Sequence, residues 1–88
     1  MKLIIAIVRD SDLEAVSRAL TSNSFRVTLI ASTGGFLRRG STTLLIGVED
    51  DQVQQGIELI RNHCAPATDQ NTHRGTIFVI PVEQYVRV

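Results

Sequence analysis

Two apolar runs, each followed by a stretch with helical spacing, constrain this chain more than any other feature. Leu3 to Val8 and Thr42 to Val48 are rich in β-branched residues and apolar on both sides of a two-residue period. This pattern is typical of strands that are covered on both faces. The two segments align at an offset of forty residues, with Ile5 falling on Leu45. Two such strand–helix units predict a ferredoxin-like fold.

The other elements complete the order β-α-β-β-α-β of an α+β sandwich. Ser11 to Glu14 fits a capping box, so we expect a helix from there to the Ser22 to Ser24 cluster. Glu49 to Asp51 predicts the start of a second helix, because acidic residues suit a helix N-terminus. Gly56 interrupts this helix, which indicates close backbone packing. The buried stripe of the second helix is expected to be Val53, Ile57, Ile60 and Cys64. Further strands are expected over Phe25 to Ala31 and Thr76 to Val82, and a short fifth strand over Gln84 to Val88.

The second face of this sheet predicts an oligomer. Both helices of the fold lie on one face, yet the strands place apolar residues on both sides. An uncovered apolar face exceeds the patch that monomers usually tolerate, and we therefore expect copies of the chain to associate. The residues alone do not set the number of copies. Length predicts a single domain over residues 1–88.

Composition narrows the partners and the compartment. Nine basic and nine acidic residues cancel, which argues against binding to a nucleic acid polymer or to an anionic membrane. One cysteine excludes an internal disulfide and indicates a reduced, cytoplasmic protein. No apolar stretch approaches the roughly 20 residues needed to cross a bilayer. The apolar start meets Arg9 and Asp10 without a small-residue cleavage site, so it predicts a strand rather than a signal peptide.

The segment 32–42 is the most informative for function, and it holds three of the six glycines. Gly34 and Gly35 allow backbone amides to turn toward an anion. Arginines in and before the segment can pair with phosphate, and Phe36-Leu37 offers an apolar surface for a base. The alternative reading is a plain hairpin connection with Phe36 in the core. The polar residues concerned are Arg26, Thr33, Arg38, Arg39, Ser41 and Thr42.

The sequence gives little support to other nucleotide-binding motifs, to a metal site or to catalysis. The segment lacks the Lys-Ser or Lys-Thr of a Walker A motif, and it joins two strands, which excludes a Rossmann turn. His63, Cys64 and His73 lack the paired spacing of a metal site. No Ser, Cys or Thr has a recognisable base beside it, and Asp50 and Asp51 are explained by helix capping. The sequence therefore predicts that the chain is not an enzyme.

Five stretches resemble the cyclic-di-AMP receptors of the PII-like signalling proteins. The most specific is the Thr-Gly-Gly-Phe-Leu-Arg run in its β-α-β-β-α-β context. The resemblance covers nearly the whole chain. The stretches are Met1 to Asp10, Asn23 to Thr28, Thr33 to Thr43, Gly47 to Val53 and Phe78 to Val82.

The resemblance implies a PII-like homotrimer with ligand clefts between neighbouring subunits. By position, it implies ligand contacts at Arg26, Thr28, Gly35, Phe36, Leu37, Gly47 and Phe78. The predicted site adds Ser24, Thr33, Gly34, Arg38 and Ser41 to these residues.

Three departures from the family pattern affect the ligand and the output. Ser24 and Ser41 stand where the family usually has Asn, and Arg87 stands where a ligand-contacting Gln is expected. The connection from Ala65 to Arg74 is short, whereas the family typically carries a long loop there. Long loops in compact domains are usually functional, and this one is expected to signal ligand state to a partner. Its loss is expected to leave either a binder with a different output or a relative that binds another ligand.

Three hypotheses follow. The first is a signalling protein without cofactor that binds cyclic-di-AMP or a related adenine nucleotide and acts on an unknown downstream protein. The second is a PII-like interaction trimer that has lost or changed its ligand. The third is a metal-handling trimer, which rests on fold analogy alone.

Overall fold

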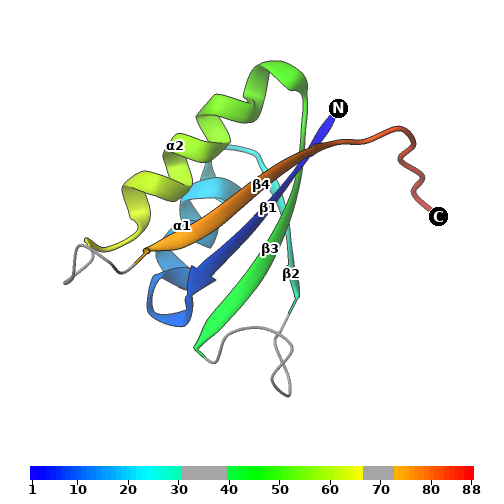
Figure 1. The fold of residues 1–88 in the computed structure, drawn as a ribbon. Helices are drawn as coiled ribbons and strands as arrows, with labels where there is room; N and C mark the ends of the chain where they lie inside the picture. Colours follow the sequence, from blue (N-terminus) through cyan, green and yellow to red (C-terminus); the bar gives the residue numbers. More distant parts are fainter. Residues whose placement is uncertain (31–39, 67–72) are drawn as a thin grey trace.

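The computed structural model describes residues 1–30, 40–66 and 73–88. Within these ranges, four strands form one antiparallel sheet in the order β2-β3-β1-β4, and two α-helices lie on one face of it (Figure 1). The predicted order of an α+β, ferredoxin-like fold is confirmed. Residues 31–39, which carry most of the glycine-rich segment, lie outside the described residues. The elements are β1 (Lys2–Arg9), α1 (Asp10–Ser22), β2 (Arg26–Ile30), β3 (Ser41–Val48), the 3-10 helix η1 (Asp50–Gln52), α2 (Val53–His63) and β4 (Gly75–Pro81).

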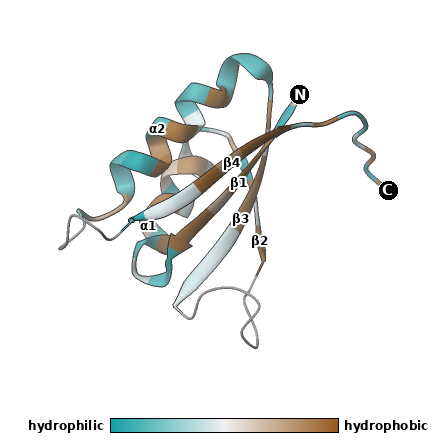
Figure 2. Cartoon of the chain, in the orientation of Figure 1, coloured by the Kyte–Doolittle hydropathy of each residue, from teal (hydrophilic) through white to brown (hydrophobic). Residues whose placement is uncertain are grey.

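The core lies between the helices and the inner face of β1 and β3. Alternate residues from Ile4 to Val8 and from Leu44 to Val48 are buried, and those between them turn to the opposite face. Figure 2 shows hydrophobic residues along the middle of these strands and hydrophilic ones on the outer side of α2. The largest fully buried side chains are Ile4, Val8, Val16, Leu20, Leu44, Ile46 and Val48.

The start of α1 differs from the prediction. The helix begins at Asp10 directly after β1, with Arg9 as N-cap and no side-chain capping bond. The Ser11 to Glu14 capping box is therefore wrong, because the strand runs straight into the helix and Ser11 is already helical. Asp12 has a different role: its buried carboxylate accepts hydrogen bonds from Arg9 Nε (2.9 Å) and from the amide of Ala65 (3.1 Å). This carboxylate joins the end of β1 to the segment after α2.

The end of α1 is a Schellman motif. The amide of Ser24 donates to the carbonyl of Thr21 (3.1 Å), and the amide of Phe25 donates to that of Leu20 (3.0 Å). Ser24 has φ 69°, the left-handed conformation that glycine or asparagine usually takes at this position. Phe25 and Leu20 are both buried, as the motif's hydrophobic contact requires. The predicted end of the helix at Ser22 to Ser24 is confirmed.

The second helical segment agrees with the sequence. Glu49 and Gln52 form a reciprocal capping box at η1, with a 3.0 Å bond between the Glu49 amide and Gln52 Oε1. The predicted stripe of α2 is confirmed, since Ile60 and Cys64 are buried and the other two residues are half-buried. Close packing at Gly56 is confirmed as well: a Cβ there would lie 2.9 Å from Ile4 Cδ1. Neither described helix is long and apolar enough to cross a membrane.

The C-terminal tail, residues 82–88, does not form the predicted fifth strand. The backbone of Val82 still donates to the carbonyl of Met1 (3.1 Å), and the chain then leaves the sheet. The prediction for Gln84 to Val88 is wrong because these residues leave the sheet and form no ladder with β4, which stays an edge strand. Figure 1 shows the tail extending beyond the end of the sheet near the N-terminus.

Candidate functional site

Three of the predicted site residues come together on the sheet face that the helices leave open. Arg26 of β2 lies opposite Gly47 of β3, and Thr28 lies opposite Leu45. Side chains alternate along a strand, so these residues point to the same face. Next in the same cross-strand row, Leu3 of β1 pairs with Gly47 from the other side.

A cavity of about 550 Å³ lies over this part of the face. Such a volume is within the range of sites for small molecules. Its walls come from all three strands named above and from residues of the C-terminal tail. The lining residues are Met1, Leu3, Arg26, Thr28, Leu45, Gly47, Val82, Tyr85 and Arg87.

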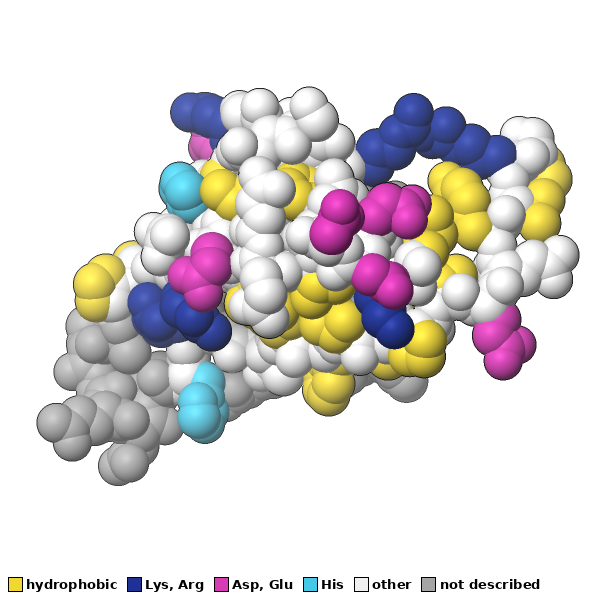
Figure 3. All heavy atoms as spheres, turned by 90° about the horizontal axis from the view of Figure 1, so that it is seen from above, with side chains coloured by type: hydrophobic (Ala, Val, Ile, Leu, Met, Phe, Trp, Pro, Cys, Tyr) yellow, Lys and Arg dark blue, Asp and Glu magenta, His cyan; other side chains and the backbone are white. Residues whose placement is uncertain are grey.

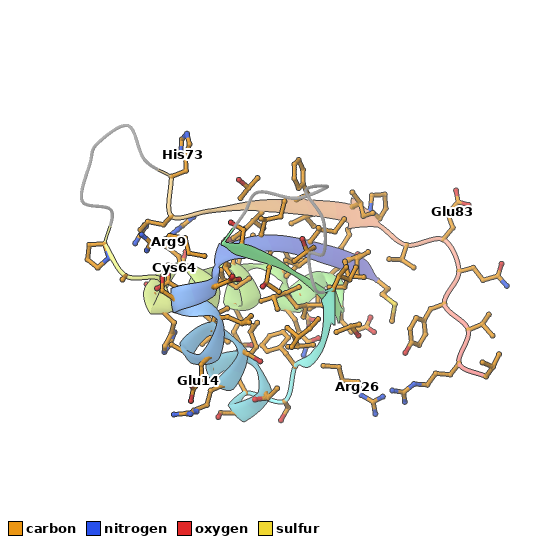
Figure 4. The ribbon with its side chains drawn as sticks, turned by 90° about the horizontal axis from the view of Figure 1, so that it is seen from below. Arg9, Glu14, Arg26, Cys64, His73 and Glu83 are labelled. Atoms are coloured by element: carbon orange, nitrogen blue, oxygen red, sulfur yellow. The ribbon has the colours of Figure 1, made fainter. Side chains whose placement is uncertain are left out.

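The side chains of this cavity combine positive charge with apolar surface. Arg26 and Arg87 supply two guanidinium groups, and none of the described residues that line the cavity is Asp or Glu. Figure 4 shows Glu83, the acidic residue of the tail, directed away from Arg26. Figure 3 shows basic side chains beside hydrophobic ones at the end of the molecule that carries the tail. Guanidinium groups next to an aromatic ring suit a ligand with both an anionic group and a flat apolar part.

Gly47 leaves open space at the floor of the cavity. A Cβ at this position would meet no atom within 4 Å, and the residue is exposed. Glycine inside a strand weakens it, and it often marks a place where a ligand or another backbone approaches closely. Packing within this chain does not require a glycine here, so the space fits an approaching molecule.

The remaining sheet residues of the predicted site lie elsewhere in the single chain. Phe78 is on the same face but in β4, opposite Ile5, and it is 52% exposed. β1 and β3 separate it from Arg26, a span of about 14 Å at the usual strand spacing. Ser41 starts β3 opposite Arg9, six residues before Gly47, and thus lies at the other end of the strand.

The other predicted positions divide into two groups. Ser24 does not line the cavity, and its conformation belongs to the end of α1. Thr42, a further candidate donor, is engaged within the chain, because its hydroxyl donates to Asp10 Oδ1 at 2.6 Å. The predicted residues Thr33, Gly34, Gly35, Phe36, Leu37 and Arg38 lie outside the described residues.

Comparison with known protein families shows which family this chain is related to. The family model described as "Cyclic-di-AMP receptor" matches residues 1–72. This chain belongs to the cyclic-di-AMP receptor family. The resemblance predicted from the sequence is thereby confirmed, and it supports a nucleotide-binding signalling role. The match includes Arg26, Thr28 and Gly47 of the cavity, whereas Phe78 and Arg87 lie beyond it.

A solved structure gives the same fold for a related chain. The crystal structure of a functionally unknown protein from Pediococcus pentosaceus ATCC 25745 is 34% identical and superimposes with a TM-score of 0.82. The similarity covers 99% of this receptor-family chain and 96% of the other chain, so the two are nearly equal in length.

Sequence reasoning missed several residues of the receptor-family cavity, and for two different reasons. Leu3 and Leu45 follow from alternation, because each shares a face with Gly47 or Thr28 once the register is known. The tail residues had no such signal, because Val82 was predicted to end the fourth strand and Tyr85 and Arg87 to lie in a fifth strand of the sheet. Arg87 was singled out by its identity and was not assigned to the site.

A second, smaller cavity of about 280 Å³ lies at the other end of the sheet. Figure 4 shows Arg9, Cys64 and His73 at this end, away from Arg26. Burial raises the pKa of the Cys64 thiol, and the charge of Asp12 raises it further. Among residues 1–30, 40–66 and 73–88, no three His, Cys, Asp or Glu side chains are grouped to hold a metal ion. The geometry therefore favours the Arg26 cavity as the functional site.

Proposed function

We propose that this protein is a signal-transduction protein that binds cyclic-di-AMP or a related adenine nucleotide in clefts between subunits of a homotrimer. The observation that supports it is the cavity over Gly47, which combines two arginines, a tyrosine and an open floor. Phosphate and adenine are the two parts of such a nucleotide, and these side chains complement both. Family membership independently supports a cyclic dinucleotide as the ligand class.

The exposed sheet face supports a location between subunits. Phe78 and Ile80 of β4 are 52% and 42% exposed, although both are large and apolar. They lie on the same face as Leu3 and Ile5, their cross-strand partners. A second copy of the chain packed on this face would bury these side chains. It would also allow Phe78 of one subunit to approach a cavity formed by the neighbouring subunit.

Within the cleft, each part of the nucleotide has a partner on the sheet or the tail. Arg26 binds phosphate, and Thr28 donates or accepts a hydrogen bond beside it. Gly47 allows the ligand to approach the backbone, and Tyr85 stacks on the adenine. No reaction is needed for this role: the protein binds the nucleotide, and ligand state is passed to a downstream protein.

The test is calorimetric titration of the purified chain with cyclic-di-AMP, ATP and AMP, together with light scattering to measure its mass. We expect saturable binding of at least one nucleotide to a species of three times the chain mass. Absence of heat with all three ligands at near-millimolar protein would overturn nucleotide binding. A monomeric mass would overturn the cleft between subunits.

A second function is favoured by one observation. A single chain does not bring Ser24, Ser41 and Phe78 to the Arg26 cavity, whereas large apolar side chains remain exposed on the sheet face. On this alternative, the protein is a PII-like interaction trimer that has lost or changed its ligand. Capture of a binding protein that is indifferent to added nucleotide would favour it.

A further inference from the structure

The junction between β1 and α1 contacts two connecting segments that are far apart in the sequence. Its residues Arg9 to Asp12 bond to the described end of the glycine-rich segment and also to the chain directly after α2. On the basis of the nucleotide-binding function proposed above, we infer that this junction couples nucleotide binding to the exposure of the end of α2. The ligand thereby acts on a surface away from its own site.

Asp10 holds the point at which the glycine-rich segment enters β3. Its amide donates to the carbonyl of Gly40 (2.8 Å), and the hydroxyl of Thr42 donates to its Oδ1 (2.6 Å). Gly40 has φ 84°, a conformation that favours glycine, so the backbone here has a defined bend. The residues of this segment indicate an anion-binding role. A bound nucleotide and Asp10 therefore act on the same stretch of backbone.

The other side of the junction holds the chain after α2. The amide of Ala65 donates to Asp12 Oδ1 (3.1 Å), and its carbonyl accepts a hydrogen bond from Arg9 Nη2 (2.6 Å). Arg9 Nη2 also lies 2.8 Å from Asp12 Oδ2. Ala65 directly follows Cys64, which is buried at the end of α2, and Figure 4 shows Arg9 and Cys64 at the same end of the molecule. These bonds fasten the end of α2 to the start of α1.

Burial of the Asp12 carboxylate makes the junction cooperative. A buried carboxylate that loses a donor keeps an unsatisfied charge, so its bonds to Arg9 and Ala65 form and break together. Asp10 and Asp12 lie in the same first turn of α1, and a shift of one displaces the other. The junction thus has a closed arrangement that covers Cys64 and an open one that exposes it. A ligand that holds the glycine-rich segment favours the closed arrangement.

The experiment uses Cys64 as the probe. It is the one cysteine of the chain and is 8% exposed, so its rate of modification by a thiol reagent measures how often the end of α2 opens. The full chain is compared without nucleotide and with saturating cyclic-di-AMP, ATP or AMP, and calorimetry on the same samples measures binding. We expect the bound nucleotide to slow modification of the wild type about five-fold or more.

Three variants test the route through Asp10. Asp10→Ala removes the acceptor of the Thr42 hydroxyl, so the slowing by nucleotide should fall below about two-fold while calorimetry still shows saturable binding. Asp10→Asn keeps an acceptor oxygen and should restore the slowing. Glu14→Ala removes the same charge one turn later on α1, where its partner is Arg18, and should behave as the wild type.

The other outcomes are distinguishable. Binding to the wild type without slower modification of Cys64 overturns the coupling and leaves the proposed nucleotide function standing, and this comparison is sufficient if Asp10→Ala does not fold. Full slowing in a folded Asp10→Ala chain shows that the effect does not pass through Asp10. Loss of binding in that folded variant makes Asp10 part of the ligand site and also overturns the inference. Absence of binding of every nucleotide to the wild type overturns the proposed function itself.

Discussion

Arg26 and Gly47 are direct cross-strand partners, so the long charged side chain of β2 stands beside a residue of β3 that has no side chain. The guanidinium group therefore borders open space rather than a packed neighbour. Gly47 thus leaves backbone accessible on the open sheet face, near the end of β3. Four of the predictions below concern residues that line this region or hold the ends of α1 in place.

Gly47→Val separates stability from ligand binding. A Cβ at this position meets no atom within 4 Å, and a β-branched residue suits a strand. We expect the free energy of unfolding to rise by about 0.5–1 kcal/mol while nucleotide binding is lost, because the side chain fills the cavity. Urea denaturation and calorimetry measure the two effects. Gly75→Ala is the control: its Cβ would lie 2.8 Å from the carbonyl oxygen of Ile7, so stability should fall.

Arg26→Ala should weaken nucleotide binding without disturbing the assembly. A charge-assisted hydrogen bond to phosphate contributes about 1.5–3 kcal/mol, and the side chain is exposed in the single chain. Calorimetry measures the affinity, and light scattering measures the mass. Arg61→Ala on α2 removes an equal charge from a residue paired with Glu58 and should leave both unchanged. A parallel loss of mass and affinity would instead make Arg26 structural.

Ser24→Gly should stabilise the fold. Ser24 holds φ 69° at the end of α1, where an L-residue is disfavoured by about 1–2 kcal/mol and glycine is not. We expect a gain of about 1 kcal/mol in the free energy of unfolding, measured by urea denaturation. Ser22→Gly, two residues earlier and still helical, should have the opposite sign. No gain at Ser24 would mean that its backbone conformation is unstrained.

Asp12→Ala should be the most damaging change outside the apolar core. It removes a carboxylate that is 4% exposed and leaves Arg9 and the amide of Ala65 without their partner. We expect a loss of about 2–4 kcal/mol, measured by thermal and urea denaturation. Glu14→Ala, which breaks the exposed pair with Arg18, should cost less than about 1 kcal/mol. Similar losses for the two variants would contradict the role assigned to Asp12.

We expect the buried thiol of Cys64 to make the fold less stable at alkaline pH. Burial raises the pKa of its thiol above the ordinary value of 9.0, so the folded state keeps the proton while the unfolded state releases it. Stability from this group is therefore complete below pH 9 and decreases as pH rises above it. Urea denaturation at pH 8 and pH 10 should show a larger decrease for the wild type than for Cys64→Ala. Equal decreases would assign the effect to other groups.

The strands and α2 were predictable because each carries its own periodic signal. β1 and β3 are apolar at successive positions. This pattern predicts strands independently of what covers their outer face. The capping residues Glu49 and Gln52 lie on the sequence next to the helix that they begin. The start of α1 was not predictable from Ser11, since it depends on where β1 stops, and Arg9 is tied there by a contact to Asp12 and the distant Ala65.

The site was predictable to the extent that it lies on the sheet. Arg26, Thr28 and Gly47 share a face through the two-residue period, and family resemblance pointed to the same positions. Tyr85 and Arg87 were not predictable, because their place depends on how the tail bends after Val82. The alternation of side chains along a strand predicts which residues share a sheet face. It contains no information on a segment that leaves the sheet.

The position of Arg87 in the tail has a consequence for how such proteins diverge. Beyond Val82 the tail adds no strand to the sheet and no side chain to the core. Replacement of a tail residue therefore alters the cavity without a penalty in folding. Natural selection can explore new ligands through a handful of tail residues, while the strands that build the domain stay under a separate and stricter constraint.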